Sequence, residues 1–140
     1  MHMFDEVITG HERLRELIGE PRGYSAAKSN DHIDGIFERF IAASPFVALA
    51  TSGADGLLDV SPKGDPAGFV AVLDSKTLVI PDRLGNQRLD SFLNLLTNPA
   101  DALLFIIPGN TETLRVAGTA RIVRDVTLQK RLFGSAKSAS

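Results

Sequence analysis

The fold is decided by residues 46–65, which read FVALATSGADGLLDVSPKGD. The largely apolar run FVALATS is followed by GADG, and glycine and aspartate favour a tight turn there because they tolerate positive φ. The run LLDVSPK then reads as the returning strand, and its proline places the end of that strand at a sheet edge or a bulge. This stretch therefore predicts a β-hairpin.

More strands are predicted on the C-terminal side of this hairpin. FVAVLD and TLVIPD flank a short turn, DALLFIIP forms a buried run, and TETLRVAGTARIVRD (residues 111–125) predicts one long strand. Most of these connections are too short for the crossover that parallel strands need. The pattern predicts a mainly β fold with peripheral helices, in which six antiparallel strands close into a small split barrel.

Helices are predicted around these strands where apolar residues recur at helical spacing. In residues 86–96 this spacing places Leu89, Phe92, Leu93 and Leu96 on one face. The other predicted helices lie in residues 9–18, 31–43 and 126–133. We expect one domain over residues 1–140, with N-terminal helices in 1–44, the barrel in 45–125 and a helical turn and tail in 126–140.

The composition suits one globular domain with its own core, since 44% of the 140 residues are hydrophobic and 23% are charged. The absence of cysteine excludes disulfides, thiolate metal sites and cysteine nucleophiles. The three histidines lack metal-ligand spacing, so we expect no metal site. No apolar run reaches the length of a membrane span and the N-terminus lacks the layout of a secretory signal, so we expect a cytoplasmic protein.

The charge distribution indicates a small ligand rather than a polymer. The net charge of -2 and the absence of tryptophan argue against nucleic-acid binding. Residues 81–140 nevertheless carry 8 basic and 5 acidic side chains, whereas residues 1–80 carry 7 basic and 12 acidic ones. The second half is therefore expected to attract a small anion.

The junction PDRLGNQRLDS (residues 81–91) offers the first candidate site for that anion. Asn86 stands at the expected N-cap, Arg88 in the first helical turn and Arg83 in the preceding loop. The free N–H groups and the dipole of a helix start attract anions, and arginine donates two hydrogen bonds to a phosphate at once. The spacing fits a capped surface helix with solvated arginines equally well.

Two strands offer further candidates. Strand alternation places Asp59, Ser61 and Lys63 on one face, where a hydroxyl and an ammonium group can bind a phosphate or the polar edge of a ring. An exposed strand face with a lysine that blunts a sheet edge is the interpretation that these residues alone favour. Thr113 and Arg115 share a face of the long strand, which can be turned to solvent, a partner subunit or a ligand.

In their order, these segments resemble the pyridoxamine 5'-phosphate oxidase-like superfamily of FMN-binding split barrels, over about residues 22–125. Within it the chain is most similar to flavoproteins with the patterns SPKGD and PDRxGNxRxDS. The resemblance implies a homodimer with FMN in a groove at the subunit interface. It implies phosphate contacts from Asn86 and Arg88 with Arg83 beside them, flavin or ribityl contacts from Ser61 and Lys63, and an approach to the ring by Thr113 and Arg115.

The resemblance further implies an FMN-dependent oxidoreductase acting on a small molecule that the sequence does not identify, with no assigned catalytic acid or base. Relatives of this type continue with another strand and a basic segment, whereas this chain is short at the C-terminus and stops at Ser140. A second hypothesis is therefore a non-enzymatic split-barrel module that has lost its cofactor. A third keeps the barrel and replaces FMN with a deazaflavin or heme.

Overall fold

The computed structural model describes residues 3–19, 31–81 and 90–134. It divides the chain into two compact units, Met1–Asp31 and His32–Ser140. The expectation of one domain over the whole chain stays a prediction.

The first unit contains helix α1 (His11–Ile18). Its N-cap is Gly10, and it ends at Gly19, where a φ of 81° suits glycine. The guanidinium group of Arg13 forms ion pairs with the carboxylates of Glu6 at 2.8 Å and Glu16 at 3.0 Å. This exposed pairing holds the segment before the helix against its first turns.

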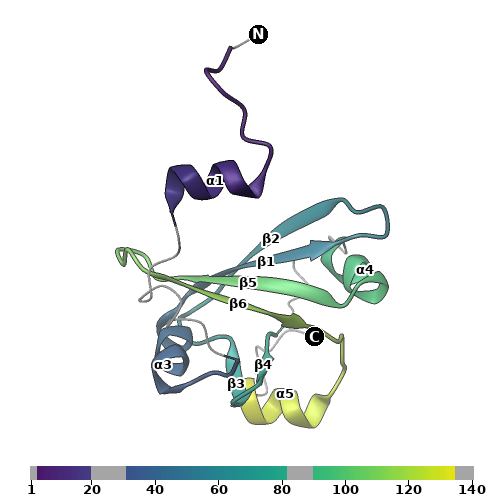
Figure 1. Cartoon of the computed structure of the whole chain (residues 1–140). Coiled ribbons are helices and arrows are strands. Elements are labelled where there is room, and N and C mark those ends of the chain that lie inside the picture. Colours follow the sequence, from purple (N-terminus) through teal and green to yellow (C-terminus); the bar gives the residue numbers. More distant parts are fainter. Residues whose placement is uncertain (1–2, 20–30, 82–89, 135–140) are drawn as a thin grey trace. The chain divides into compact units, whose positions relative to one another are not determined.

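The second unit is built on a four-stranded antiparallel sheet in the order β2-β1-β5-β6, with a separate two-stranded hairpin, β3-β4. Its strands are β1 (Phe46–Ser52), β2 (Leu58–Gly64), β3 (Ala71–Asp74), β4 (Thr77–Val79), β5 (Ala100–Ile106) and β6 (Thr113–Thr119). Its helices are α3 (Gly35–Ala43), α4 (Asp90–Thr97) and α5 (Val126–Phe133). Figure 1 shows α3 and the β3-β4 hairpin on one side of the sheet, and α4 at the end where β1 turns into β2.

The prediction of a mainly β fold with antiparallel strands and peripheral helices is confirmed. Among the described residues there are six strands, and no hydrogen-bonded ladder joins the four-stranded sheet to the hairpin. Closure into a six-stranded split barrel therefore stays a prediction.

Strand β6 is shorter than the predicted strand over residues 111–125, because it ends at Thr119. Thr119 pairs with Ala100, the first residue of β5. Pro99 precedes Ala100. Its carbonyl accepts a backbone hydrogen bond from the N–H of Ala120 at 2.8 Å, just beyond the last pair of the ladder. Because β5 begins only at Ala100, the described residues that follow Ala120 pair with no strand of the sheet.

The core lies on one face of the sheet. Val47 and Leu49 of β1, Phe105 of β5 and Leu114 of β6 are all less than a tenth exposed. Because directly paired residues share a face, the strand register groups these side chains together. We call this side the core face and the opposite side the outer face.

Helix α3 closes the core. The carboxylate of Asp34 accepts a hydrogen bond from the N–H of Phe37 at 2.9 Å and so caps the helix start. Ile41 is 1% exposed and belongs to the same core cluster as Val47. At the helix end, the hydroxyl of Ser44 donates to the carbonyl of Ile106 at 2.9 Å, which attaches α3 to β5.

Candidate functional site

The polarity of strand β2 is reversed relative to an ordinary strand on a core. The register pairs Asp59 with Thr51, Ser61 with Leu49, and Lys63 with Val47, so the polar row lies on the core face. These three polar side chains are partly buried, whereas Leu58 and Val60 on the outer face are 81% and 64% exposed. The predicted alternation is confirmed, but the exposed polar face that the residues alone favoured is wrong.

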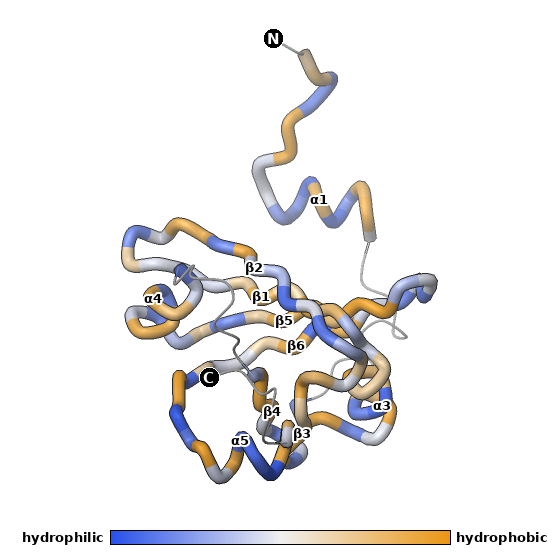
Figure 2. Tube along the Cα trace, turned by 180° about the vertical axis from the view of Figure 1, so that it is seen from behind, coloured by the Kyte–Doolittle hydropathy of each residue, from blue (hydrophilic) through white to orange (hydrophobic). Residues whose placement is uncertain are grey.

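Helix α4 is reversed in part. Of the residues that the periodicity placed on an apolar face, Leu93 and Leu96 are 58% and 74% exposed, Phe92 is partly buried, and Leu89 lies outside the described residues. The buried side chains are Ser91 and Leu95. Figure 2 shows apolar residues along α4 and in the neighbouring part of the β1-β2 hairpin. A count of apolar positions missed the inward face because polar residues occupy part of it.

Two hydrogen bonds account for that polar inward face. The hydroxyl of Ser91 donates to a carboxylate oxygen of Asp59 at 3.3 Å. One helical turn later, the side-chain amide of Asn94 donates to the hydroxyl oxygen of Thr51 at 3.0 Å. We call these four residues the polar seam. Thr51 is only 3% exposed, so a partner for its hydroxyl matters to stability.

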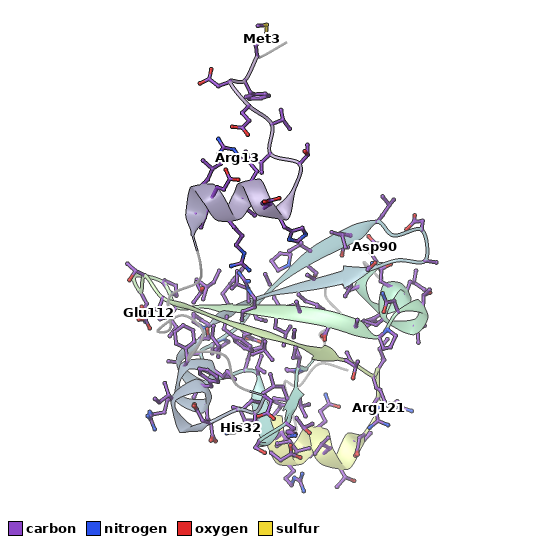
Figure 3. The ribbon with its side chains drawn as sticks, in the orientation of Figure 1. Met3, Arg13, His32, Asp90, Glu112 and Arg121 are labelled. Carbon is purple, nitrogen blue, oxygen red and sulfur yellow. The ribbon has the colours of Figure 1, made fainter. Side chains whose placement is uncertain are left out.

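The polar seam was not predicted, although its elements were visible in the sequence. Ser91 and Asn94 are three residues apart and therefore share a helix face. A search for apolar spacing alone overlooks such a pair. Figure 3 shows Asp90 at the end of the sheet where β1 turns into β2, and Glu112 at the opposite end. The start of α4 is thus placed beside the first residues of β2.

A further carboxyl group lies on the core face. Asp101 alternates with the buried Leu103 and Phe105 along β5, and it pairs with Gly118 of β6. Burial raises the pKa of the Asp101 carboxyl above its usual value. This group is partly buried and belongs to the same strand end as Ala100, near the chain segment that leaves α4.

The predicted site residues fall into separate places. Ser61 and Lys63 lie on the core face of β2, whereas Thr113 and Arg115 are exposed on the outer face of β6, paired with Ile106 and Leu104. Strands β2 and β6 are the two edges of the sheet, and three strand spacings separate them by roughly 14 Å. One chain therefore does not bring the two pairs together. The predicted phosphate residues, Arg83, Asn86 and Arg88, lie outside the described residues.

Two other kinds of site are absent from residues 3–19, 31–81 and 90–134. In these ranges, no three His, Asp or Glu side chains are grouped so that they would hold a metal ion. No helix in the same ranges combines the length and the apolar character needed to cross a membrane.

Comparison with known proteins finds a matching family model and solved structures of similar fold. The family model described as pyridoxamine 5'-phosphate oxidase matches residues 33–140. A histidine-to-alanine variant of HupZ from Group A Streptococcus has a similar structure, with 21% identity over 62% of this chain and 67% of that chain and a TM-score of 0.50. HutZ, the heme storage protein from Vibrio cholerae, has 16% identity over 73% of this chain and 76% of that chain, with a TM-score of 0.50. Among curated proteins, none matches.

Proposed function

Because this chain belongs to the pyridoxamine 5'-phosphate oxidase family, we propose that it is an FMN-binding flavoprotein with oxidoreductase activity. The observation that carries the proposal is the polar row of β2, which lies partly buried on the core face beside the start of α4. Bound FMN would supply transfer of a hydride or of single electrons. The chain itself would bind the cofactor, orient it and provide charge around it.

The spacing along β2 suits an elongated anionic ligand. Asp59 is attached to α4, and Ser61 and Lys63 follow on the same face at intervals of about 6.6 Å. A phosphate at the start of α4 would benefit from the helix dipole and from free N–H groups. The resemblance adds Asn86 and Arg88, four and two residues before Asp90. The ribityl chain and the ring would then extend past Ser61 toward Lys63.

Lys63 has a second role in this proposal. Its ammonium group is a fixed positive charge on the core face, paired across the ladder with the fully buried Val47. A fixed positive charge beside the ring would stabilise the negative charge that develops on a reduced flavin. Lys63 would therefore affect both the affinity for FMN and its reduction potential.

A homodimer explains why the remaining candidates lie elsewhere. Thr113 and Arg115 are on the opposite face and the opposite edge from Ser61 and Lys63, so one flavin that touches both pairs needs two copies of the chain. The outer face would be the interface, because Leu58 and Val60 of β2 expose apolar surface on it. In a two-fold symmetric dimer each flavin would lie between β2 of one copy and β6 of the other.

Heme is the second candidate, motivated by the fold shared with the heme storage protein HutZ. Heme iron in proteins is usually ligated by His, Cys, Met or Tyr. Residues 33–140 contain none of these, because the chain has no cysteine and its other such residues all lie at or before His32. The family-matched segment does supply hydrogen-bond donors for a phosphate. This difference favours FMN over heme.

The proposal is tested by titrating the purified protein with FMN, riboflavin and hemin, followed by flavin fluorescence and absorption spectra. We expect tighter binding of FMN than of riboflavin, and a loss of about 1–3 kcal/mol for FMN in Lys63→Met and Arg88→Ala, the scale of a lost hydrogen bond to a charged group. Lys76→Met in the β3-β4 turn and Arg131→Ala in α5 are matched controls at exposed positions and should bind like the wild type.

The same titration separates the alternatives. Binding of hemin without FMN would replace the proposal with a heme protein. Binding of neither would contradict it in favour of a module without a cofactor. Binding of FMN without any reduction of the flavin by a chemical or enzymatic donor would leave a flavin carrier in place of an oxidoreductase.

A further inference from the structure

We propose that Asp59 and Ser91 are positioning residues for the FMN phosphate. Their hydrogen bond would fix the start of α4 relative to the part of β2 that carries Ser61 and Lys63. The inference rests on the proposed FMN-binding function and deepens it, because it says how the two halves of the site are held in register.

The contacts of α4 carry this inference. Ser91 and Asn94 are on one side of the helix and donate to residues of two neighbouring strands, Asp59 of β2 and Thr51 of β1. Hydrogen bonds depend on distance and angle, whereas burial of Leu95 on the same side is non-directional. The polar seam, rather than apolar packing, therefore sets the position of α4 along the sheet.

The charge of Asp59 also supports a positioning role for this residue. A carboxylate close to a phosphate site weakens anion binding by Coulomb repulsion. Asp59 nevertheless stands beside the start of α4, where its oxygen accepts the hydroxyl proton of Ser91. If Asp59 acts as an acceptor, a neutral residue that still accepts the hydrogen bond should serve as well or better. If Asp59 has no positioning role, any neutral replacement should strengthen FMN binding.

The experiment measures dissociation constants for FMN and riboflavin in Ser91→Ala, Asp59→Ala, the double variant and Asp59→Asn, with Ser75→Ala in the β3-β4 turn as a control. Ser91→Ala and Asp59→Ala should each weaken FMN binding by about three- to tenfold, the effect of one lost hydrogen bond. The double variant should be no weaker than the weaker single variant, because one interaction is removed in all three. Asp59→Asn should bind FMN at least as tightly as the wild type.

Riboflavin provides the readout that a merely structural role would not give. It lacks the phosphate, so its affinity should stay unchanged in all these variants. Three results would overturn the positioning role: equal losses of affinity for FMN and riboflavin, additive losses in the double variant, or unchanged FMN binding in both alanine variants. In each case, FMN binding by the wild type would still uphold the proposed function. A wild type that binds no flavin would overturn both. Because alanine is the best helix former, Ser91→Ala should fold.

Discussion

The second unit contains two regions with opposite polarity. Around β1, β5 and α3, apolar side chains lie inside, and Val47, Phe105 and Ile41 are at most 1% exposed. Around β2 and α4, polar side chains take up much of the inside, next to Leu95, and other leucines lie outside, with Leu58 and Leu96 at 81% and 74% exposure. Both regions share the same sheet, so the difference comes from the side chains and not from the architecture.

This difference indicates that residues that stabilise the fold and residues that bind a ligand or a partner lie in different regions. Burying a leucine stabilises a protein by about 1.5–3 kcal/mol relative to leaving it exposed, so β2 and α4 forgo part of that stabilisation in a single chain. A polar inward face is useful where a charged ligand binds, and an apolar outward face is useful where a second copy packs. We therefore interpret the first region as the part that stabilises the fold and the second as the part that binds.

The largest expected effect on folding lies in the first region. Phe105→Ala should lower the free energy of unfolding by about 3–5 kcal/mol, because it opens a cavity in a side-chain cluster with almost no exposure. Urea denaturation followed by circular dichroism measures this loss. Leu93→Ala in α4 is the comparison, and a loss as large as that of Phe105→Ala would erase the distinction between the two regions.

The next effect lies at the boundary of the two regions, in the polar seam. Thr51→Val should cost about 1–3 kcal/mol, because the side-chain amide of Asn94 loses its acceptor at a position that is 3% exposed in the wild type. Removing both groups in Thr51→Val with Asn94→Leu should recover part of that loss in a urea titration. A double variant less stable than Thr51→Val alone would show that the seam is not held by this pair.

A smaller effect is expected at Asp101, with a definite pH dependence. Burial raises the pKa of its folded carboxyl, so the native state binds a proton that the unfolded state has released. Stability should fall as pH rises through the window between the unfolded and the folded pKa. Asp101→Asn should therefore stabilise the protein at neutral pH, by less than about 1 kcal/mol because a partly exposed group is screened by solvent, and the gain should vanish in acid.

Asp74 is the matched control with the opposite sign. The backbone N–H of Lys76, and then Thr77, donate hydrogen bonds that lower the pKa of its carboxyl. That contribution is present above the unfolded pKa and is lost as pH falls through the folded pKa. Asp74→Asn should therefore destabilise at neutral pH. Urea denaturation midpoints of Asp101→Asn and Asp74→Asn, measured from acid to neutral pH, test both predictions. If the two substitutions changed the midpoint at neutral pH in the same direction, this interpretation would be contradicted.

The smallest effect on folding is expected on the outer face. Val60→Ser should change the free energy of unfolding of the dilute chain by no more than about 0.5 kcal/mol, because the wild-type side chain is 64% exposed. The same change should weaken self-association if the outer face is the dimer interface. Sedimentation velocity over a range of concentrations measures this, and an unchanged association would exclude Val60 from an interface.

Much of the fold could be predicted from the sequence, because the signals for it are local. The β1-β2 hairpin, the succession of strands along the chain and the sharing of a face by Asp59, Ser61 and Lys63 all follow from turn residues and alternation. The direction of that face could not be predicted, since alternation says which side chains lie together but not which side is buried. The end of β6 depends on Pro99, the residue that precedes its partner strand.

The candidate site was predictable only in part for the same reason. Ser61 and Lys63 are neighbours on one strand, whereas their separation from Arg115 depends on the sheet order, which pairs strands that are distant in the sequence. The inward position of Ser91 likewise depends on an acceptor 32 residues away. Interactions between distant segments decide both points, and a single sequence shows only which side chains are available for them.

If each flavin lies between the core face of β2 in one copy and the outer face of β6 in the other, two different variants should complement each other, and mixing them tests this arrangement most directly. Lys63→Met and Arg115→Ala should each bind FMN weakly as homodimers. In an equal mixture that has exchanged subunits, each hybrid dimer regains one intact site, so about a quarter of all sites should recover wild-type affinity. A mixture that binds no more FMN than the two variants measured separately would contradict this arrangement.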